Sequence, residues 1–214
     1  AGLVAQVASA VSANVDYVSS YVFRGATLSA DPALQPSIEG EVCGVAVGTW
    51  GSFNSDTSTF DEIDLYASVG LPSLIEGVDL SIGLTEYTYS GAFAGLESDT
   101  EIALSASTEA YGHELGVTYA DYVDGFDATY VEFGVSGGYD LSESVSAEYG
   151  YTLGHWDVEG VESGLAYHAV SFGVSTALND STSIGASFTV LENADIEDFV
   201  DEDSVFVVSI GGSY

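Results

Sequence analysis

The sequence predicts an all-β fold: a closed, antiparallel, up-and-down transmembrane β-barrel of about 12 strands. Three observations support this fold class. Apolar and polar residues alternate along almost the whole chain, and the connections between the alternating segments are longer and shorter in turn. The 214 residues also include 25 Gly, 14 Tyr and 10 Phe but only 3 Pro, a composition that suits half-buried strands better than helices.

Each expected strand has one apolar face and one face of small or acidic residues. Near the middle of the chain, Ile102, Leu104 and Ala106 share one face, whereas Glu101 and Ser105 share the other. This period of two is typical of strands with one polar face. The segments that show it are residues 13–24, 34–42, 45–53, 62–71, 78–89, 100–110, 114–122, 128–139, 145–156, 166–177, 183–191 and 204–214.

The connections alternate in length. Those after the odd-numbered strands include GATLSADPA, NSDTSTFDE, VDGFD and ENADIEDFVDED, whereas those after the even-numbered strands include a turn at Cys43, YGHE and LNDST. Outer-membrane barrels show this asymmetry, with long external loops and short periplasmic turns. An even strand number and a final strand that ends on Tyr214 agree with that class.

A soluble sandwich or ligand-binding barrel gives the same alternation with the apolar face turned inward. However, a closed barrel of this strand number has an interior wider than side chains can fill. We therefore expect a polar lumen and an apolar outer surface that contacts a lipid bilayer.

Composition excludes several other classes. The chain has 34 Asp and Glu against one Lys or Arg, a formal charge of −33, so it cannot neutralise nucleic acid phosphates. A hydrophobic fraction of 46% excludes an acidic disordered chain. The lone Cys43 cannot form an intramolecular disulfide. No uninterrupted apolar stretch reaches the roughly 18 residues of a membrane helix.

No catalytic motif is evident, so we expect no enzyme activity and no cofactor. His113, His155 and His168 are far apart in the sequence and predict no metal triad. The chain also lacks a nucleophile elbow, a P-loop and a dinucleotide fingerprint.

The segment 13–24 is expected to be the first strand, with Arg24 in the lumen. On this prediction Ala13, Val15, Tyr17, Tyr21 and Phe23 face lipid, whereas Asp16 and Ser20 face inward with Arg24. Neighbouring strands offer it Glu39, Glu41, Glu62 and Asp64. Bidentate pairs of this kind would hold the wall or an inward-folded loop; a gating or solute-binding arginine is the alternative.

Acidic residues dominate the expected lumen face. They are Asp16, Glu39, Glu41, Asp64, Glu101, Glu109, Glu132 and Glu148. Such a lumen would concentrate small cations and repel anions, whereas acids at the rims would only be hydrated. So many like charges repel one another unless salt screens them, which favours a saline habitat and a halophilic protein.

The last long connection is a second acidic cluster. Its carboxylates are Glu192, Asp195, Glu197, Asp198, Asp201, Glu202 and Asp203. Hard cations such as Ca²⁺ prefer this chemistry, although plain hydration explains it equally and the spacing is not that of an EF-hand.

Residues 1–12 form an apolar extension before a barrel domain at residues 13–214. The extension could lengthen the first strand, plug the barrel or pair with a neighbouring subunit. The last option defines an alternative function, a self-assembling subunit of a cell-surface layer or filament. The first residue is Ala, which suggests that a signal peptide has been removed.

The first half of the chain carries short motifs that resemble the proteobacterial TorF-like porin family. They are YVFRG at residues 21–25, PALQ at 32–35, WGS at 50–52, EIDLY at 62–66 and YTYSG at 87–91. The resemblance implies a small outer-membrane pore without a well-defined substrate. The sequence thus predicts a passive, cation-favouring pore for small solutes in the outer membrane of a Gram-negative bacterium.

Overall fold

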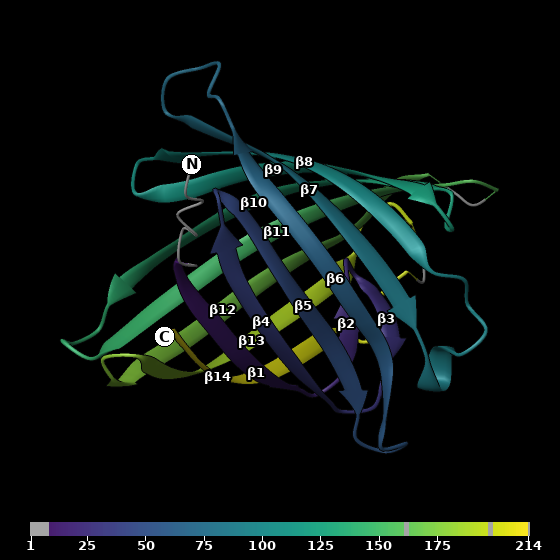
Figure 1. The fold of residues 1–214 in the computed structure, drawn as a ribbon, viewed down its shortest axis with the longest axis horizontal. Coiled ribbons are helices and arrows are strands. Elements are labelled where there is room, and N and C mark those ends of the chain that lie inside the picture. Colours follow the sequence, from purple (N-terminus) through teal and green to yellow (C-terminus); the bar gives the residue numbers. More distant parts are fainter. Residues whose placement is uncertain (1–8, 161–162, 197–198, 214) are drawn as a thin grey trace, which may run out of the picture.

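The computed structural model describes residues 9–160, 163–196 and 199–213, and within them twelve strands close into one antiparallel barrel. Each strand pairs with its neighbours in the chain, except that β1 pairs with β4 and with β14 (Figure 1). The wall strands are β1 (Ser9–Val18), β4 (Ala33–Val42), β5 (Val45–Asn54), β6 (Thr59–Leu71), β7 (Val78–Tyr89), β8 (Asp99–Ala110), β9 (His113–Asp124), β10 (Ala128–Asp140), β11 (Val145–Val158), β12 (Gly164–Asn179), β13 (Thr182–Asn193) and β14 (Ser204–Ser213).

The predicted fold class is confirmed by the closure of this sheet. The first and last strands pair antiparallel, with Ser12 opposite Ser213 and Val18 opposite Val207. Closure leaves no open sheet edge in the described wall, which is the requirement for strands that cross lipid.

The expected first strand, residues 13–24, is wrong at both ends. β1 starts at Ser9 and ends at Val18, and the chain then leaves the wall. Two short strands follow, β2 (Tyr21–Phe23) and β3 (Ala26–Ser29), which pair only with each other. The residues between them, Arg24 and Gly25, have φ of 50° and 85°, as a tight hairpin turn of the primed type requires.

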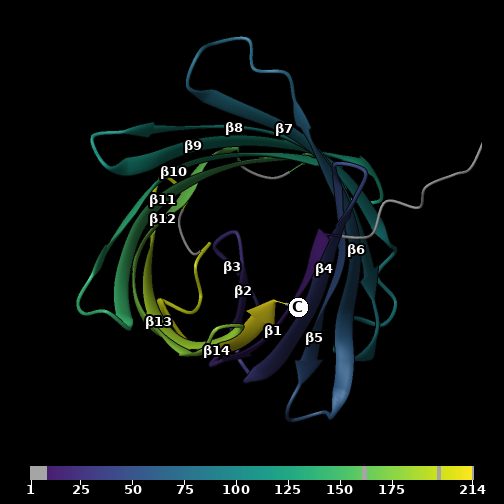
Figure 2. The same cartoon turned by 60° about the vertical axis from the view of Figure 1, so that its left-hand side comes forward.

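Residues 21–29, called the plug below, lie inside the barrel. Figure 2 shows β2 and β3 within the ring of wall strands, together with part of the connection between β13 and β14. The backbone N–H of Glu202 in that connection donates to Thr27 Oγ1 at 3.0 Å. Tyr21 and Phe23 therefore lie in the lumen and do not face lipid as expected.

The N-terminal extension is only partly described. Residues 9–12 belong to β1, whereas residues 1–8 lie outside the described part of the chain. Self-assembly through this extension stays a prediction.

Three connections at one end are longer than every connection at the other end, but the other three at that end are not. These are residues 55–58, 125–127 and 159–163, which are shorter than expected because flanking strands extend further than the alternation indicated. The long connections are residues 90–98, which contain the 3-10 turn η1 (Gly91–Phe93), residues 194–203, and the segment that forms the plug.

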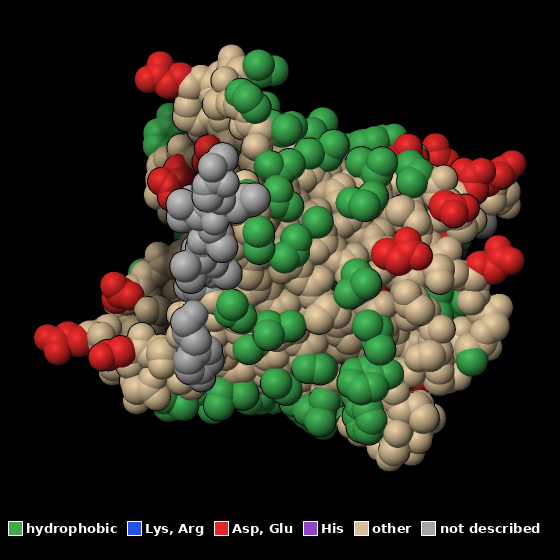
Figure 3. All heavy atoms as spheres, viewed as in Figure 1, with side chains coloured by type: hydrophobic (Ala, Val, Ile, Leu, Met, Phe, Trp, Pro, Cys, Tyr) green, Lys and Arg blue, Asp and Glu red, His purple; other side chains and the backbone are tan. Residues whose placement is uncertain are grey.

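The outer wall is apolar. Leu65, Leu104 and Phe172 are among many large hydrophobic side chains that remain exposed on it. Figure 3 shows hydrophobic side chains over the middle of the visible wall and acidic side chains at its two ends. Among the described residues, no helix has the length and apolar character needed to span a bilayer.

The expectation of a polar lumen holds for only part of the barrel, because aromatic side chains line the rest. Buried aromatic residues from the inward faces of β7, β9, β10, β11 and β12 pack around the plug: Tyr87, Tyr122, Tyr130, Trp156 and Tyr167. Ile196 from the last long connection joins them. Side chains alone cannot fill a barrel of this width, but the hairpin supplies the missing volume at the long-loop end.

Candidate functional site

The centre of the plugged half is Arg24, at the tip of the plug. Its Nη1 and Nη2 donate to the two carboxylate oxygens of Glu101 on β8, at 2.5 and 3.0 Å. The hydroxyl oxygen of Tyr122 lies 3.2 Å from the same Nη1. Arg24 is 15% exposed and Glu101 is 3% exposed. This is a bidentate, nearly dry ion pair that fastens the plug to the wall.

Aromatic rings surround the guanidinium. Its Cζ lies 4.4 Å from the ring centroid of Tyr130 and 4.8 Å from that of Phe23. Trp156 lies further away and donates its indole N–H to the backbone oxygen of Arg24 at 3.2 Å. A desolvated cation over aromatic faces is a favourable contact, so the rings stabilise the charge as well as exclude water.

The protonation state of Arg24 follows from the same contacts. Burial acts to lower the pKa of the guanidinium, but the hydrogen bonds and negative charge of Glu101 outweigh it, so the pKa lies above its ordinary value. The plug therefore carries a fixed positive charge.

Gly25 is required beside it for two reasons. Its φ of 85° lies in the left-handed region, and a Cβ there would overlap the ring of Tyr167. Arg24 and Gly25 of the YVFRG motif thus form the hairpin turn, and the absence of a side chain at Gly25 lets the turn pack closely against the wall.

The ion pair differs from the expected one in its partner. Glu39, Glu41, Glu62 and Asp64 were the expected acids, but Arg24 binds Glu101 because the hairpin carries it away from β1. Of the two roles expected for Arg24, the structure agrees with the first, in which its ion pair holds an inward-folded segment.

The strand register places all of the predicted lumen acids on inward positions. Asp16 lies opposite Gln35, and its carboxylate accepts from Asn14 at 2.7 Å. Glu132 accepts from the Tyr130 hydroxyl at 2.6 Å. The remaining acids follow the same alternation on their strands: Glu39, Glu41, Asp64, Glu101, Glu109 and Glu148.

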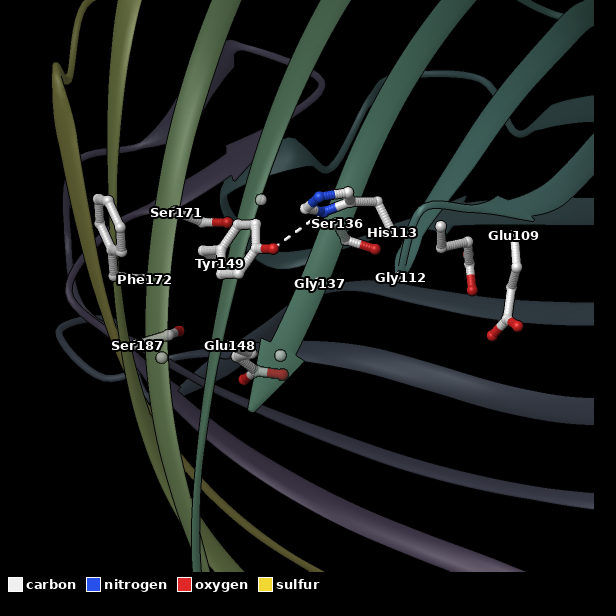
Figure 4. Close-up of a pocket in the computed structure, with 14 residues that line it drawn as sticks. Glu109, Gly112, His113, Ser136, Gly137, Glu148, Tyr149, Ser171, Phe172 and Ser187 are labelled. Atoms are coloured by element: carbon white, nitrogen blue, oxygen red, sulfur yellow. Dashed lines mark hydrogen bonds between the residues drawn. The ribbon is translucent and has the colours of Figure 1, made fainter. Parts of the chain in front are cut away.

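The half of the lumen near the short turns is open. A cavity of about 540 Å³ is lined by three acids, Glu109, Glu114 and Glu148, by Gly and Ser residues, and by His113, Tyr149 and Phe172 (Figure 4). A second cavity of about 440 Å³ continues past Glu132. A Cβ at Gly134 would meet nothing within 4 Å, which shows how much space the glycines leave here.

The histidines do not form a site. His113 Nδ1 lies 2.9 Å from the Tyr149 hydroxyl, the contact that is dashed in Figure 4. His168 lies 3.5 Å from Glu192 on the neighbouring strand. Both positions face outward by register.

The acidic cluster predicted as a Ca²⁺ loop is spread out. Glu192 belongs to β13, the backbone N–H of Glu202 binds the plug, and Glu197 and Asp198 lie outside the described residues. Across the described ranges, no three or more His, Cys, Asp or Glu side chains are grouped as metal ligands. Calcium binding by Asp195, Asp201 and Asp203 stays a prediction.

Sequence reasoning missed the aromatic residues around the plug and two buried acids, Asp61 and Asp99, as site residues. A signal was present, since Tyr87, Tyr122, Tyr130, Trp156 and Tyr167 occupy the same alternating positions as the lumen acids. Bulky rings facing a wide lumen indicate that something packs against them.

The protein is a closed barrel with an apolar outer wall and an acidic, partly plugged lumen. These features place its fold in the class of outer-membrane barrels. Residues 4–210 match the family described as "Bacterial protein of unknown function (Gcw_chp)". The chain belongs to this Gcw_chp family. No curated protein sequence matches it significantly.

Solved porin and channel structures share the fold. The KdgM porin is similar at a TM-score of 0.63 and 7% identity, over 96% of this chain and 99% of that one. The NanC porin is similar at 0.58 and 11%, over 95% and 98%. The COG4313 outer membrane channel from Pseudomonas putida F1 is similar at 0.55 and 12%, over 96% and 95%.

Proposed function

We propose that this protein is a passive outer-membrane channel of the TorF-like porin type that favours small cations and small cationic or neutral solutes. The bilayer contacts its apolar outer wall, and the plug narrows its lumen at the long-loop end. The observation that carries the proposal is the imbalance of charge inside the barrel.

That imbalance is large because the chain has one basic side chain of the Lys or Arg type. Arg24 is already paired with Glu101. Glu109, Glu114 and Glu148 line the open cavity without any such cation beside them. Negative side chains in a confined lumen raise the local concentration of cations and lower that of anions.

A comparison sharpens the proposed selectivity. One KdgM porin structure is a complex with disordered oligogalacturonate, which is a polyanion. An acidic lumen like that of the present chain disfavours such a solute. We therefore propose a similar barrel that disfavours polyanionic solutes.

The position of the plug determines whether the channel conducts. It fills the long-loop half of the lumen, while the short-turn half holds the cavities. Conduction is therefore low while Arg24 is paired and rises when the plug is displaced.

Reversal potentials in planar bilayers under a salt gradient test the selectivity. The wild-type channel should prefer potassium to chloride, and the double variant Glu109→Gln with Glu148→Gln should lose part of that preference. Asp180→Asn, on a short turn outside the barrel wall, serves as the control and should keep it. A wild-type preference for chloride would refute the proposal.

A further inference from the structure

Five carboxylates are buried on the inner wall near the plug: Asp61, Glu62, Asp64, Asp99 and Glu101. Three of them have hydrogen-bond donors for both oxygens. Asp61 accepts from Asn54 at 3.0 Å and from the Ala92 N–H at 2.7 Å. Asp99 accepts from the Tyr89 hydroxyl and the Phe126 N–H, at 2.8 and 2.6 Å. Glu101 binds Arg24 with both oxygens.

Glu62 and Asp64 do not have hydrogen-bond donors for both of their carboxylate oxygens. Glu62 accepts at Oε2 from the Tyr21 hydroxyl of the plug, at 2.9 Å. Asp64 is 8% exposed, and its Oδ1 is buried with no hydrogen-bond partner. The two residues are neighbours on the inner face of β6, and their carboxyl groups lie within hydrogen-bond reach of each other.

Nothing around the pair balances its charge. Neighbouring strands place Ser52 and Trp50 opposite Glu62 and Asp64 on one side, and Tyr89 and Tyr87 on the other. The charged groups closest to the pair are Asp99 and Glu101, which add negative charge. Arg24 is committed to Glu101. A buried, unpaired carboxylate is costly, so the pair needs either a bound cation or a shared proton to be stable.

We propose that Glu62 and Asp64 form a site for a hard divalent cation of the calcium type at the foot of the plug. Two carboxylates match its two charges, and the Tyr21 hydroxyl brings a third oxygen from the plug. Calcium accepts about 6 to 8 oxygen ligands in flexible geometry, and lumen water would complete the shell. Because Tyr21 belongs to β2, the bound cation ties the plug to β6 as Arg24 ties it to β8.

Terbium luminescence tests the site directly, since Trp50 lies opposite Asp64 and can transfer energy to a bound lanthanide. The full chain in detergent, freed of metal by a chelator, is titrated with Tb³⁺ under tryptophan excitation and then with competing Ca²⁺. The expected result is a saturable signal that Ca²⁺ displaces and that Asp64→Asn abolishes. Trp50→Phe should weaken the signal without removing the effect of Ca²⁺ on stability.

Thermal unfolding at constant ionic strength gives the second readout. Calcium should raise the Tm of the wild type but not that of Asp64→Asn, and in chelator the variant should melt above the wild type because excess charge is gone. If Asp64→Asn fails to fold, Glu62→Gln takes its place with the same expected results. Asp201→Asn with Asp203→Asn is the matched control in the acidic connection and should keep the calcium response.

Two outcomes would overturn the site. The calcium response could persist in Asp64→Asn and disappear in the control, which would place binding in the connection. Alternatively, mild acid could stabilise the wild type while Ca²⁺ does not, which would show that the pair shares a proton.

Discussion

Glu101→Gln tests whether the ion pair holds the plug in the lumen. The amide keeps the shape of the side chain but removes its charge, so Arg24 remains buried without a counterion when the plug is docked. Breaking a buried pair by removing one partner costs about 3–5 kcal/mol. Because Arg24 retains 15% exposure, we take the lower end of that range. Since about 1.4 kcal/mol corresponds to tenfold, the ratio of docked to displaced plug should fall about a hundredfold.

Single-channel recording is the assay for this variant. Glu101→Gln should open more often and to a larger conductance than the wild type, while circular dichroism shows an intact barrel. Glu132→Gln is the matched control, since it removes an inward acid that accepts from Tyr130 but does not contact Arg24. If folded Glu101→Gln conducts like the wild type, the ion pair does not hold the plug.

Two further predictions concern the plug turn and the overall charge. Gly25→Ala should displace the plug and raise conductance, because it adds backbone strain of about 1–2 kcal/mol and a clash with Tyr167. Gly112→Ala carries similar strain at φ 79° with open space around it, so it should leave conductance unchanged; equal effects of the two would contradict the role of Tyr167. The Tm should rise from low to molar NaCl, because the Debye length falls from about 8 Å at physiological salt to about 3 Å at 1 M and weakens repulsion among the carboxylates. A Tm that does not depend on salt would contradict the expected saline habitat.

The wall of the barrel was predictable because alternation is a local property of each strand. Ile102 and Leu104 alternate with Glu101 and Ser105, and the register confirms the two faces. The plug was not predictable in this way. Tyr21 and Phe23 continue the alternation of Val15 and Tyr17, so the pattern does not show where the chain leaves the wall.

The partner of Arg24 was beyond sequence reasoning for a different reason. Glu101 is separated from it by 77 residues, and only the folded path of the hairpin brings the two together. Charge alone does not distinguish Glu101 from the several acids on nearer strands that could also serve as a counterion for Arg24. Glu62 and Asp64, which were offered as partners of Arg24, instead form the unbalanced pair on β6.

The position of the plug near the start of the chain constrains the order of assembly. Its contacts reach forward by 77 residues to Glu101, 132 to Trp156 and 175 to Glu202. Contacts between residues so distant in sequence form late, because the intervening chain must first be ordered. The plug can therefore make its contacts with Glu101 and Trp156 only once β8 and β11 have joined the barrel.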